Sequence, residues 1–355
     1  MVINYVGADV HSQTTWFCVL NTSGATVLET PVKTNAKDLV GFIRVLSGEV
    51  HLAIEEGTQA HWLYSLLRGE VSRMIVCDPS KISRSGGSPN KTDRKDAWRV
   101  ADLLRKDELH PVFHDYLGKD ELRALVRNHQ FLTQDLSRVK NQLKALYTSQ
   151  GISARGQRVY GEKGRESYFE QLSGTGIRTR AQTLYVKLDL FRALVEDART
   201  QLLKEGRKFK PAKILRSVPG IGPIRSSMLV AIMGTPHRFP TRQAFWSYCG
   251  FAVVMHATGQ YSVAHSGKII PNKKANKTRG LNRNRNPHLK KVFKGAAIVA
   301  VRQPEFAAYL DRLMEGGLSR DVAMVTVARK LATIVLTIWK KEVSYDPKRL
   351  LEQEA

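Results

Sequence analysis

The sequence predicts a chain of three parts: a mixed α/β domain at residues 1–108, a helical stem at 109–210 and a mainly α-helical domain at 211–355. Three observations support this division. Short β-branched runs alternate with helical patterns at the start of the chain, heptad spacing dominates the middle, and helical patterns return near the end. Because 42% of the 355 residues are hydrophobic, folded cores are expected and disorder of the whole chain is excluded.

Strand and helix signals alternate through the N-terminal domain. The predicted order is βββαβαβ, with strands at 5–10, 15–20 and 25–32, a helix at 35–46, a strand at 51–54, a helix at 59–67 and a strand at 74–77. This order is typical of a mixed α/β sheet. Residues 80–92 are rich in Ser, Gly and Lys and predict a basic loop, after which a helix starts at Thr92 or Asp93.

Two heptad patterns predict a pair of long helices in the stem. From Leu122 to Leu146, mostly apolar residues step by three and four positions over nearly four heptads, and a second pattern runs from Leu184 to Leu202. Such spacing is typical of coiled coils, which form as a hairpin within one chain or between chains. The stem is therefore expected to support an oligomer, either a dimer or a tetramer.

The C-terminal domain shows helical patterns separated by turns. Residues 264–288 interrupt them with an Asn- and Lys/Arg-rich stretch that has no periodicity and predicts an irregular loop. The last helix carries Arg329 and Lys330 within its most apolar stretch, which indicates a buried helix face rather than a membrane span. The predicted helices lie near residues 224–233, 241–248, 289–302, 304–315 and 319–341, the last with Ser319 as its N-cap.

Positive charge is concentrated in one segment. The chain carries 56 Lys and Arg against 32 Asp and Glu, yet the 99 residues between Glu205 and Glu305 hold 19 Lys and Arg and no acid. That segment supplies +19 of the formal net charge of +24. A surface kept basic only for solubility would mix both signs, whereas a segment without carboxylates fits a polyanion. No Lys/Arg-rich amphipathic helix with an aromatic face indicates a membrane there, so nucleic acid is the expected partner.

Cysteine content and the first residues indicate the compartment. The three cysteines, Cys18, Cys77 and Cys249, form no CxxC pair and cannot build a disulfide scaffold. The N-terminus lacks the basic patch and apolar core of a signal peptide. We therefore expect a cytoplasmic protein.

Four carboxylates are placed where they can meet. Asp9 and Glu55 end predicted strands, and Asp93 and Asp96 lie three residues apart at a predicted helix start, so both project from one helix face. Two strand ends and one helix face can hold two divalent ions. That arrangement stabilises the attacking and leaving oxygens of a phosphodiester.

The acids also have a structural interpretation. Asp93 could be a helix N-cap, with Asp96 in the favourable first turn. His11, two residues from the first strand acid, is expected to support the site rather than to bind metal. His110 and His114 have the spacing of zinc ligands, but a proline separates them and no partner cysteines follow, so zinc is not expected.

A second motif lies at residues 218–222, where Val-Pro-Gly-Ile-Gly precedes a predicted helix. This pattern is typical of the turn in a helix-hairpin-helix motif. There, Gly220 and Gly222 would let backbone N–H groups approach a phosphate at the helix N-terminus. The alternative is a tight turn between two helices with no ligand. The acid-free surroundings favour phosphate contact.

Taken together, these motifs resemble the insertion-sequence transposases of the IS110 type, which include the Piv-like DNA invertases. The similarity covers most of the chain. Its specific part is the block Lys91-Thr92-Asp93-Arg94-Lys95-Asp96-Ala97, followed at the right distance by Pro-Gly-Ile-Gly. The supporting motifs are Gly7-Ala8-Asp9, Ile54-Glu55 with Gly57-Thr58, Phe245 to Gly250, Ser217-Val218 and Ala328 to Ala332.

The resemblance implies a RuvC-like (RNase H-like) N-terminal domain with an Asp-Glu-Asp-Asp tetrad, a coiled-coil stem and a C-terminal transposase domain. It implies a prokaryotic DNA recombinase, associated with the nucleoid when active, that acts as a homo-oligomer on donor and target duplexes. A bridge-type noncoding RNA from its own element would guide it. The tetrad, here Asp9, Glu55, Asp93 and Asp96, would bind Mg²⁺.

In the family, a C-terminal serine attacks the phosphodiester and forms a covalent protein–DNA intermediate. Counting eight positions on from Gly250 leads to Thr258-Gly259 where the family has Ser-Gly, so Thr258 takes the nucleophile's place. A threonine hydroxyl can do the same chemistry but is more crowded. Ser262 and Ser266 are the nearby alternatives. The residues expected at the nucleic-acid backbone are Gly220, Gly222, Lys273, Lys274, Arg279, Arg283, Arg285, Lys290 and Lys291.

Two other functions stay open from the residues alone. A metal-dependent nuclease similar to Holliday-junction resolvases would use water as its nucleophile, and Thr258 would then be structural. Such a nuclease would still cut DNA after Thr258→Ala. A non-catalytic RNA- or DNA-binding protein would keep its function after alanine substitution of Asp93 and Asp96.

Overall fold

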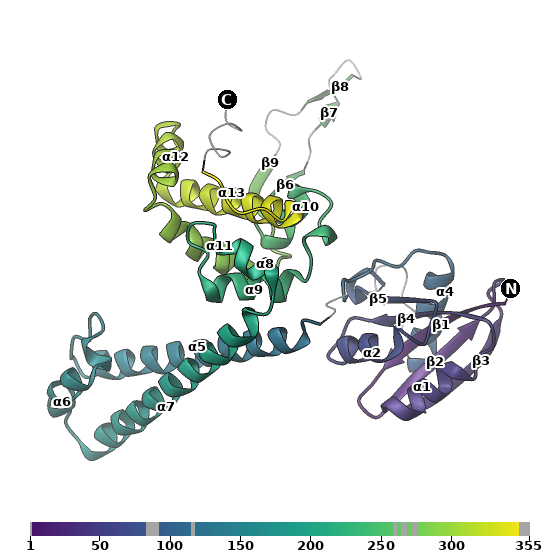
Figure 1. The fold of residues 1–355 in the computed structure, drawn as a ribbon, viewed down its shortest axis with the longest axis horizontal. Coiled ribbons are helices and arrows are strands. Elements are labelled where there is room, and N and C mark those ends of the chain that lie inside the picture. Colours follow the sequence, from purple (N-terminus) through teal and green to yellow (C-terminus); the bar gives the residue numbers. More distant parts are fainter. Residues whose placement is uncertain are drawn as a thin grey trace. The chain divides into compact units, whose positions relative to one another are not determined.

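The chain forms two compact units, Met1–Asp115 and Tyr116–Ala355, in a computed structural model (Figure 1). The predicted C-terminal domain and residues 116–210 of the predicted stem belong to the second unit, whereas residues 109–115 belong to the first. The structure describes residues 2–82, 92–114, 118–258, 261–263, 268–271 and 276–347. Within these, only the backbone is described at residues 255–258, 261–263, 269–271 and 276–279.

The first unit is built on a five-stranded sheet with the order β3-β2-β1-β4-β5. The central β1 (Ile3–Val10) runs antiparallel to β2 (Thr14–Leu20) and parallel to β4 (Glu49–Glu55). The edge strands are β3 (Thr26–Lys33), which is antiparallel to β2, and β5 (Arg73–Cys77), which is parallel to β4. This mixed sheet confirms the predicted order of elements and is compatible with a RuvC-like domain.

Helices cover both faces of this sheet. The buried residues of α1 (Ala36–Arg44) and α2 (Ala60–Leu67) pack with Val6 and Ala8 on one face. On the other face lies α4 (Asp93–Arg105), whose buried residues pack against β2, β4 and β5. Because side chains alternate along a strand, Gly7 faces α4.

The prediction of a basic loop at residues 80–92 is wrong for its first three residues. Residues Pro79–Ile82 form a short helix, α3. Asp78 Oδ1 accepts a hydrogen bond from the Ser80 backbone N–H at 2.9 Å, which satisfies one of the donors that a helix start leaves unpaired. Residues 83–91 of the predicted loop lie outside the described part of the chain.

Gly7 allows α4 to lie directly on β1. A Cβ atom at this position would lie 2.1 Å from the backbone oxygen of Ala97 and 2.4 Å from the backbone nitrogen of Ala101. Both atoms belong to the helix backbone and cannot rotate away. The absence of a side chain at residue 7 therefore sets how closely the helix approaches the strand.

We expect Gly7→Ala to destabilise the first unit by about 3 kcal/mol, because its methyl group has to displace the backbone of α4. Differential scanning calorimetry of the full chain measures this change. Gly41→Ala is the matched control: Gly41 is an exposed residue of α1 with nothing within 4 Å of a Cβ, so this substitution should stabilise by roughly 0.5–1 kcal/mol. Equal stability of the two variants would contradict the close packing at residue 7.

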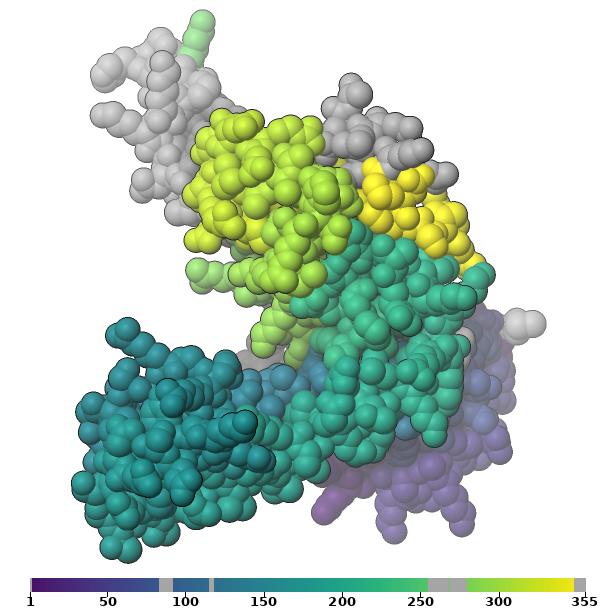
Figure 2. Space-filling view, turned by 60° about the vertical axis from the view of Figure 1, so that its left-hand side comes forward, coloured from purple at the N-terminus to yellow at the C-terminus, as the bar shows by residue number. Residues whose placement is uncertain are grey.

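The second unit begins with two long antiparallel helices, α5 (Asp120–Ser149) and α7 (Thr175–Gly206). Their shared core joins the end of α5 to the start of α7, and in Figures 1 and 2 the teal pair projects from the helices that follow it. None of the heptad residues is exposed. Between them lie two shorter helices, η1 (Arg158–Tyr160) and α6 (Glu162–Glu170).

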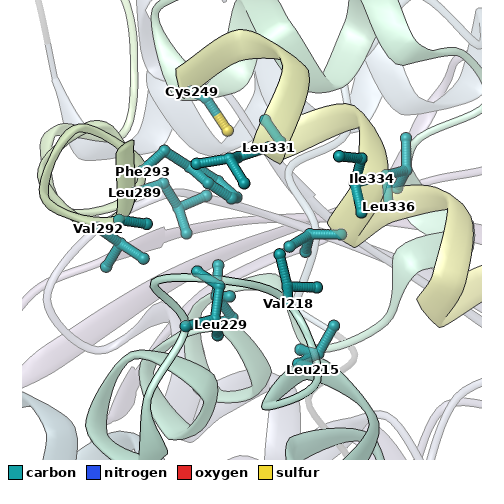
Figure 3. Packing of buried hydrophobic residues seen from close by; sticks show 14 of the residues in the cluster. Leu215, Val218, Leu229, Cys249, Leu289, Val292, Phe293, Leu331, Ile334 and Leu336 are labelled. Atoms are coloured by element: carbon teal, nitrogen blue, oxygen red, sulfur yellow. The ribbon is translucent and has the colours of Figure 1, made fainter. Parts of the chain in front are cut away.

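Six further helices share one core, in which Cys249, Phe293 and Leu331 lie together (Figure 3). Among the described residues, the last of these helices is the one long and apolar enough to cross a membrane, and half of its apolar stretch is buried inside the protein. Its N-cap is Ser319 as predicted, but the Ser319 side chain makes no capping bond. The helices are α8 (Lys210–Leu215), α9 (Pro223–Met233), α10 (Arg242–Cys249), α11 (Pro287–Ala300), α12 (Pro304–Glu315) and α13 (Arg320–Lys341).

The prediction of an irregular loop at residues 264–288 is wrong in part. In this region β6 (Val253–Thr258) pairs with β9 (Asn276–Leu281), and β7 (Tyr261–Val263) pairs with β8 (Ile269–Pro271), both antiparallel. The sequence of β9, Asn-Lys-Thr-Arg-Gly-Leu, has no alternation of apolar and polar residues. A two-stranded ribbon belongs to no larger sheet, so its pairing leaves no pattern of one buried face in the sequence.

Candidate active site

The ends of β1 and β4 bring two predicted carboxylates to one edge of the sheet. Ala8 pairs with Ile54 in the parallel register, and Asp9 and Glu55 are the next residues of the two strands. Because side chains alternate, both acids lie on the face of Gly7, which α4 covers. Both line a cavity of about 470 Å³ at this edge.

The first turn of α4 supplies the other two acids. Thr92 is the N-cap, and its side chain accepts a hydrogen bond from the backbone N–H of Lys95 at 3.4 Å. Asp93 is therefore the first residue of the helix rather than its cap. Asp96 follows in the same turn. The capping alternative does not account for Asp93.

Asp9, His11 and Asp93 form a compact group. His11 Nε2 lies 3.2 Å from Asp9 Oδ2 and 3.6 Å from Asp93 Oδ1. One possible ligand atom from each residue lies within 4.8 Å of the other two. These side chains come from a strand end, the turn after it and the start of α4, so the group depends on how α4 packs on the sheet.

The environment of Asp9 disfavours its ionised form. Partial burial is the largest cause and raises the pKa of Asp9. The charge and hydrogen bond of His11 lower that pKa, while the negative charges of Asp93 and Asp96 raise it. A cation placed among these carboxylates would relieve both the desolvation and the repulsion, and carboxylate oxygens are the ligands that hard divalent cations prefer. The donor set therefore fits a divalent metal ion.

The four predicted acids take different places in this arrangement. Asp9 and Asp93 belong to the compact group. Asp96 is close enough for its charge to act on Asp9, and Glu55 lines the cavity beside it. His11 belongs to the group, although the sequence led us to expect a supporting role. The only signal for it was its position, two residues after a strand-end carboxylate.

A second pair, which the sequence did not predict, borders the cavity. His114 Nε2 hydrogen-bonds to Glu56 Oε2, and the buried His114 ring lies beside the rings of His61 and Tyr64. Glu56 lines the same cavity as Asp9. No spacing rule connects residues 58 positions apart, so only the folded structure reveals this pair.

The candidate nucleophile belongs to the second unit. Thr258 ends β6 and its backbone pairs with Asn276 of β9. The alternative Ser262 lies in β7 opposite Ile270. The side chains of Thr258 and Ser262, and all of Ser266, lie outside what the structure describes.

The predicted nucleic-acid-binding cations differ in exposure. Arg283 and Lys291 are exposed on the second unit. The backbone of Arg279 lies in β9 opposite Met255, with its side chain outside the described part. Lys273 and Lys274 lie outside the described residues altogether.

Two of these cations are half-buried and also hold local structure. Arg285 packs on Gly250, where a Cβ atom would lie 1.9 Å from its Cδ, and its guanidinium donates to the carbonyl oxygen of Asn282 at 3.2 Å. The ammonium of Lys290 lies 5.9 Å from the ring centre of Phe251. Burial lowers the pKa of Lys290, as do the neighbouring positive charges.

The turn between α8 and α9 contains the two predicted glycines. Gly220 has a φ angle of +78°, and its Cβ would lie 2.3 Å from the backbone oxygen of Ala296. Packing against α11 therefore requires glycine there, with or without a ligand. Gly222 is the N-cap of α9, and no atom of the residues that the structure describes lies within 4 Å of a Cβ at that position. The backbone at Gly222 is thus open to the approach of a large group.

A basic pocket of about 280 Å³ lies beside this turn. It is lined by Arg207, Lys213 and Arg216, together with Pro223 at the start of α9, and no described acid lines it. Backbone N–H groups at a helix start and nearby cations both attract phosphate. The pocket and the open backbone at Gly222 therefore suit a phosphate group.

We expect alanine substitution of these two glycines to affect two different quantities, the stability of the protein at Gly220 and the binding of DNA at Gly222. Gly220→Ala should destabilise the second unit by about 3 kcal/mol, because the substitution combines a positive φ with a backbone clash. Gly222→Ala should leave the melting temperature unchanged and weaken binding of a DNA duplex roughly fivefold, equivalent to about 1 kcal/mol, by hindering phosphate approach. Calorimetry and fluorescence anisotropy measure the two quantities. If Gly222→Ala bound DNA as tightly as the wild type, the prediction that this turn contacts a DNA phosphate would be wrong.

Two family models match the chain. Residues 6–149 match a model of the DEDD type of IS110 transposases, described as "Transposase". Residues 212–311 match the model described as "Transposase IS116/IS110/IS902 family". The first match covers the sheet, α4 and α5, and the second covers α8 to the middle of α12.

Curated relatives carry the same description. The chain is 33% identical over 150 residues to the transposase for insertion sequence element IS1533 of Leptospira borgpetersenii, which is 38% of this chain and 43% of that protein. It is 25% identical over 211 residues (59% and 52%) to the putative transposase y4qE of Sinorhizobium fredii. It is 20% identical over 217 residues (58% and 57%) to the transposase for insertion sequence element IS1111A of Coxiella burnetii. The chain spans about half the length of these relatives.

Proposed function

Because the chain belongs to the IS110 family of transposases, we propose that it is a DNA recombinase that cleaves and rejoins DNA during transposition. The observation that carries this proposal is the group of Asp9, His11 and Asp93 at the sheet edge, with Asp96 and Glu55 beside it. A non-catalytic binding protein would gain nothing from repelling carboxylates gathered beside a cavity.

We assign Asp9, Glu55, Asp93 and Asp96 as the residues that hold Mg²⁺. The charges of Asp93 and Asp96 act on Asp9, and Glu55 lines the cavity with Asp9, so the donor set fits a hard divalent ion. When bound, Mg²⁺ neutralises charge on the phosphodiester oxygens. The Asp9–His11 hydrogen bond orients both side chains, and the buried His114 holds Glu56 at the cavity wall.

Thr258 is the nucleophile in this proposal. Its Oγ loses a proton and forms a bond to phosphorus while the bond from phosphorus to a deoxyribose oxygen breaks; that oxygen takes up a proton and leaves as a hydroxyl, and DNA stays attached to the protein. Attack by a deoxyribose hydroxyl on that link would rejoin the DNA and release the threonine. Support comes from the position of Thr258-Gly259, which stands where the family pattern has Ser-Gly, and from the carboxylates elsewhere in the same chain that fit a divalent ion.

The partners follow from the same assignment. Donor and target DNA duplexes and a bridge-type noncoding RNA would bind the basic second unit, through Gly220, Gly222 and the cations between Lys273 and Lys291. A coiled-coil stem at residues 109–210 would join copies of the chain into a dimer or a tetramer, between a RuvC-like domain at 1–108 and a transposase domain at 211–355. The protein would act in the prokaryotic cytoplasm, on the nucleoid.

One preparation tests these assignments together. The full chain is purified from cells that carry its element, copurifying RNA is sequenced, and DNA covalently attached to protein is trapped with Mg²⁺ under denaturing conditions. Mass spectrometry then maps the attached residue. We expect an element-encoded RNA and an adduct on Thr258. DNA cleavage without any adduct would identify a nuclease that uses water, and neither cleavage nor an adduct would exclude the proposed function.

A further inference from the structure

A basic groove follows one face of α13 and involves none of the residues assigned above. The groove has a volume of about 810 Å³ and is lined by α10, α12 and α13 within the second unit. Five cationic side chains line it, Arg242, Arg329, Lys330, Lys340 and Lys341, and the acid Asp346 lines an adjoining pocket that shares Lys330 and Lys341. The four cations from α13 lie beyond the acid-free segment, so the groove is a separate concentration of positive charge.

Helix periodicity places these residues on one stripe of α13. Thr326, Lys330, Thr333, Thr337 and Lys341 step by three or four positions and all line the groove. Residues on the other side of the helix are buried in the core, among them Val327, Leu331 and Val335. One face of α13 thus stabilises the fold, and the other is polar and faces the groove.

The aromatic rings of the groove already hold cations. The guanidinium groups of Arg242 and Arg329 lie 5.8 and 5.6 Å from the Trp246 ring centre. The Lys330 ammonium and the Arg312 guanidinium each lie 5.9 Å from the Tyr309 ring centre. Proteins that bind single strands offer open aromatic faces on which bases stack. Here the rings position positive charge instead, which suits phosphates rather than bases.

Two of the cations also tie the groove to the fold. Arg329 donates to the carbonyl oxygen of Phe251 from Nε at 3.1 Å and from Nη2 at 2.7 Å. Lys340 donates to the carbonyl oxygen of Phe239 at 2.5 Å. Substituting either would disturb the core as well as the groove, so Lys330 and Lys341 are the better residues to test.

We propose that this groove binds the phosphate backbone of double-stranded DNA. The inference rests on the proposed function, which makes DNA the substrate, and adds where the protein holds the duplex. From Thr326 to Lys341 the stripe is about 22 Å long at 1.5 Å per residue. One DNA strand presents a phosphate about every 3.4 Å along the axis, so the stripe spans roughly six phosphates.

The test measures how strongly salt weakens binding. A fluorescein-labelled duplex of random sequence is titrated with the full chain at several KCl concentrations, and the logarithm of the association constant is plotted against the logarithm of salt. We expect Lys330→Gln/Lys341→Gln to reduce the slope by about 1.8, since each phosphate contact contributes about 0.9. Lys330→Arg/Lys341→Arg should keep the original slope, because charge rather than packing makes the contact.

A matched control and a second probe keep the outcomes distinct. Lys33→Gln/Lys37→Gln removes two exposed charges from the first unit and should leave the slope unchanged. An unchanged slope for the Lys330/Lys341 glutamine variant overturns the inference but leaves the proposed function standing. The second probe is a fluorescein-labelled single strand. If the Lys330/Lys341 glutamine variant changes the slope for this single strand but not for the duplex, the inference is also overturned. No duplex binding by the wild-type chain would instead count against the proposed function.

Discussion

Replacing Asp9 with Asn should abolish DNA cleavage while leaving the first unit folded. Asp9 belongs to the compact group with His11 and Asp93, and it is the partly buried member on which the other charges act. Losing a carboxylate that holds a catalytic metal should cost about 4 kcal/mol or more, which is at least about a thousandfold in rate. Asn keeps the shape of the side chain and removes one repelling charge, so the metal-free protein should not lose stability.

Two measurements separate this outcome from simple unfolding. In wild-type protein, Mg²⁺ should raise the melting temperature, since a ligand that binds only the folded state stabilises it, and Asp9→Asn should lose that rise. Glu108→Gln is the control, because Glu108 is an exposed acid of the same unit that does not line the cavity. Full cleavage by Asp9→Asn would show that this group is not the catalytic centre.

Thr258→Ala should eliminate the covalent protein–DNA adduct and reduce strand exchange by at least about four orders of magnitude. Removing the nucleophile of a covalent mechanism leaves only the contributions of binding and charge stabilisation. Thr258→Ser should keep the adduct, because it retains the hydroxyl and removes the crowding methyl group. The measurement is gel separation of protein-linked DNA after incubation with Mg²⁺.

The same assay distinguishes the alternatives for this residue. Ser262→Ala should behave like wild type. An adduct that survives Thr258→Ala but is lost on Ser262→Ala or Ser266→Ala would move the nucleophile to that serine. Cleavage that survives Thr258→Ala with no adduct in any variant would show that water attacks phosphorus, as in a metal-dependent nuclease.

Local sequence patterns predicted the strands and helices whose burial produces a regular spacing of apolar residues. The strands of the first unit appear as apolar runs because both faces of the sheet are covered, and the heptads of α5 and α7 repeat because one stripe of each helix is buried. The β6–β9 ribbon left no such signal. The short helix α3 was also missed, because only four residues form it.

The site was predicted to the extent that it depends on strand ends and helix starts. Asp9, Glu55, Asp93 and Asp96 could be proposed because strand ends and helix starts are visible in the sequence. Whether Asp93 caps its helix could not be decided until Thr92 was seen to do so. The Glu56–His114 pair and the role of Gly7 arise from tertiary packing between segments far apart in the chain, which no local spacing encodes.

The absence of a side chain at residue 7 has a practical consequence for redesign of this protein. The distance between the acids on the strands and those on α4 depends on a contact between the backbone of β1 at Gly7 and the backbone of α4. Because side chains take no part in this contact, substituting neighbouring side chains cannot restore that distance once it is lost. The apolar layer beneath α1 and α2 lies on the opposite side of the sheet and does not determine that separation. Volume-conserving substitutions in search of a more robust protein are therefore better placed in that layer, away from Ala60 and Leu63, which line the cavity, and residue 7 has to stay glycine.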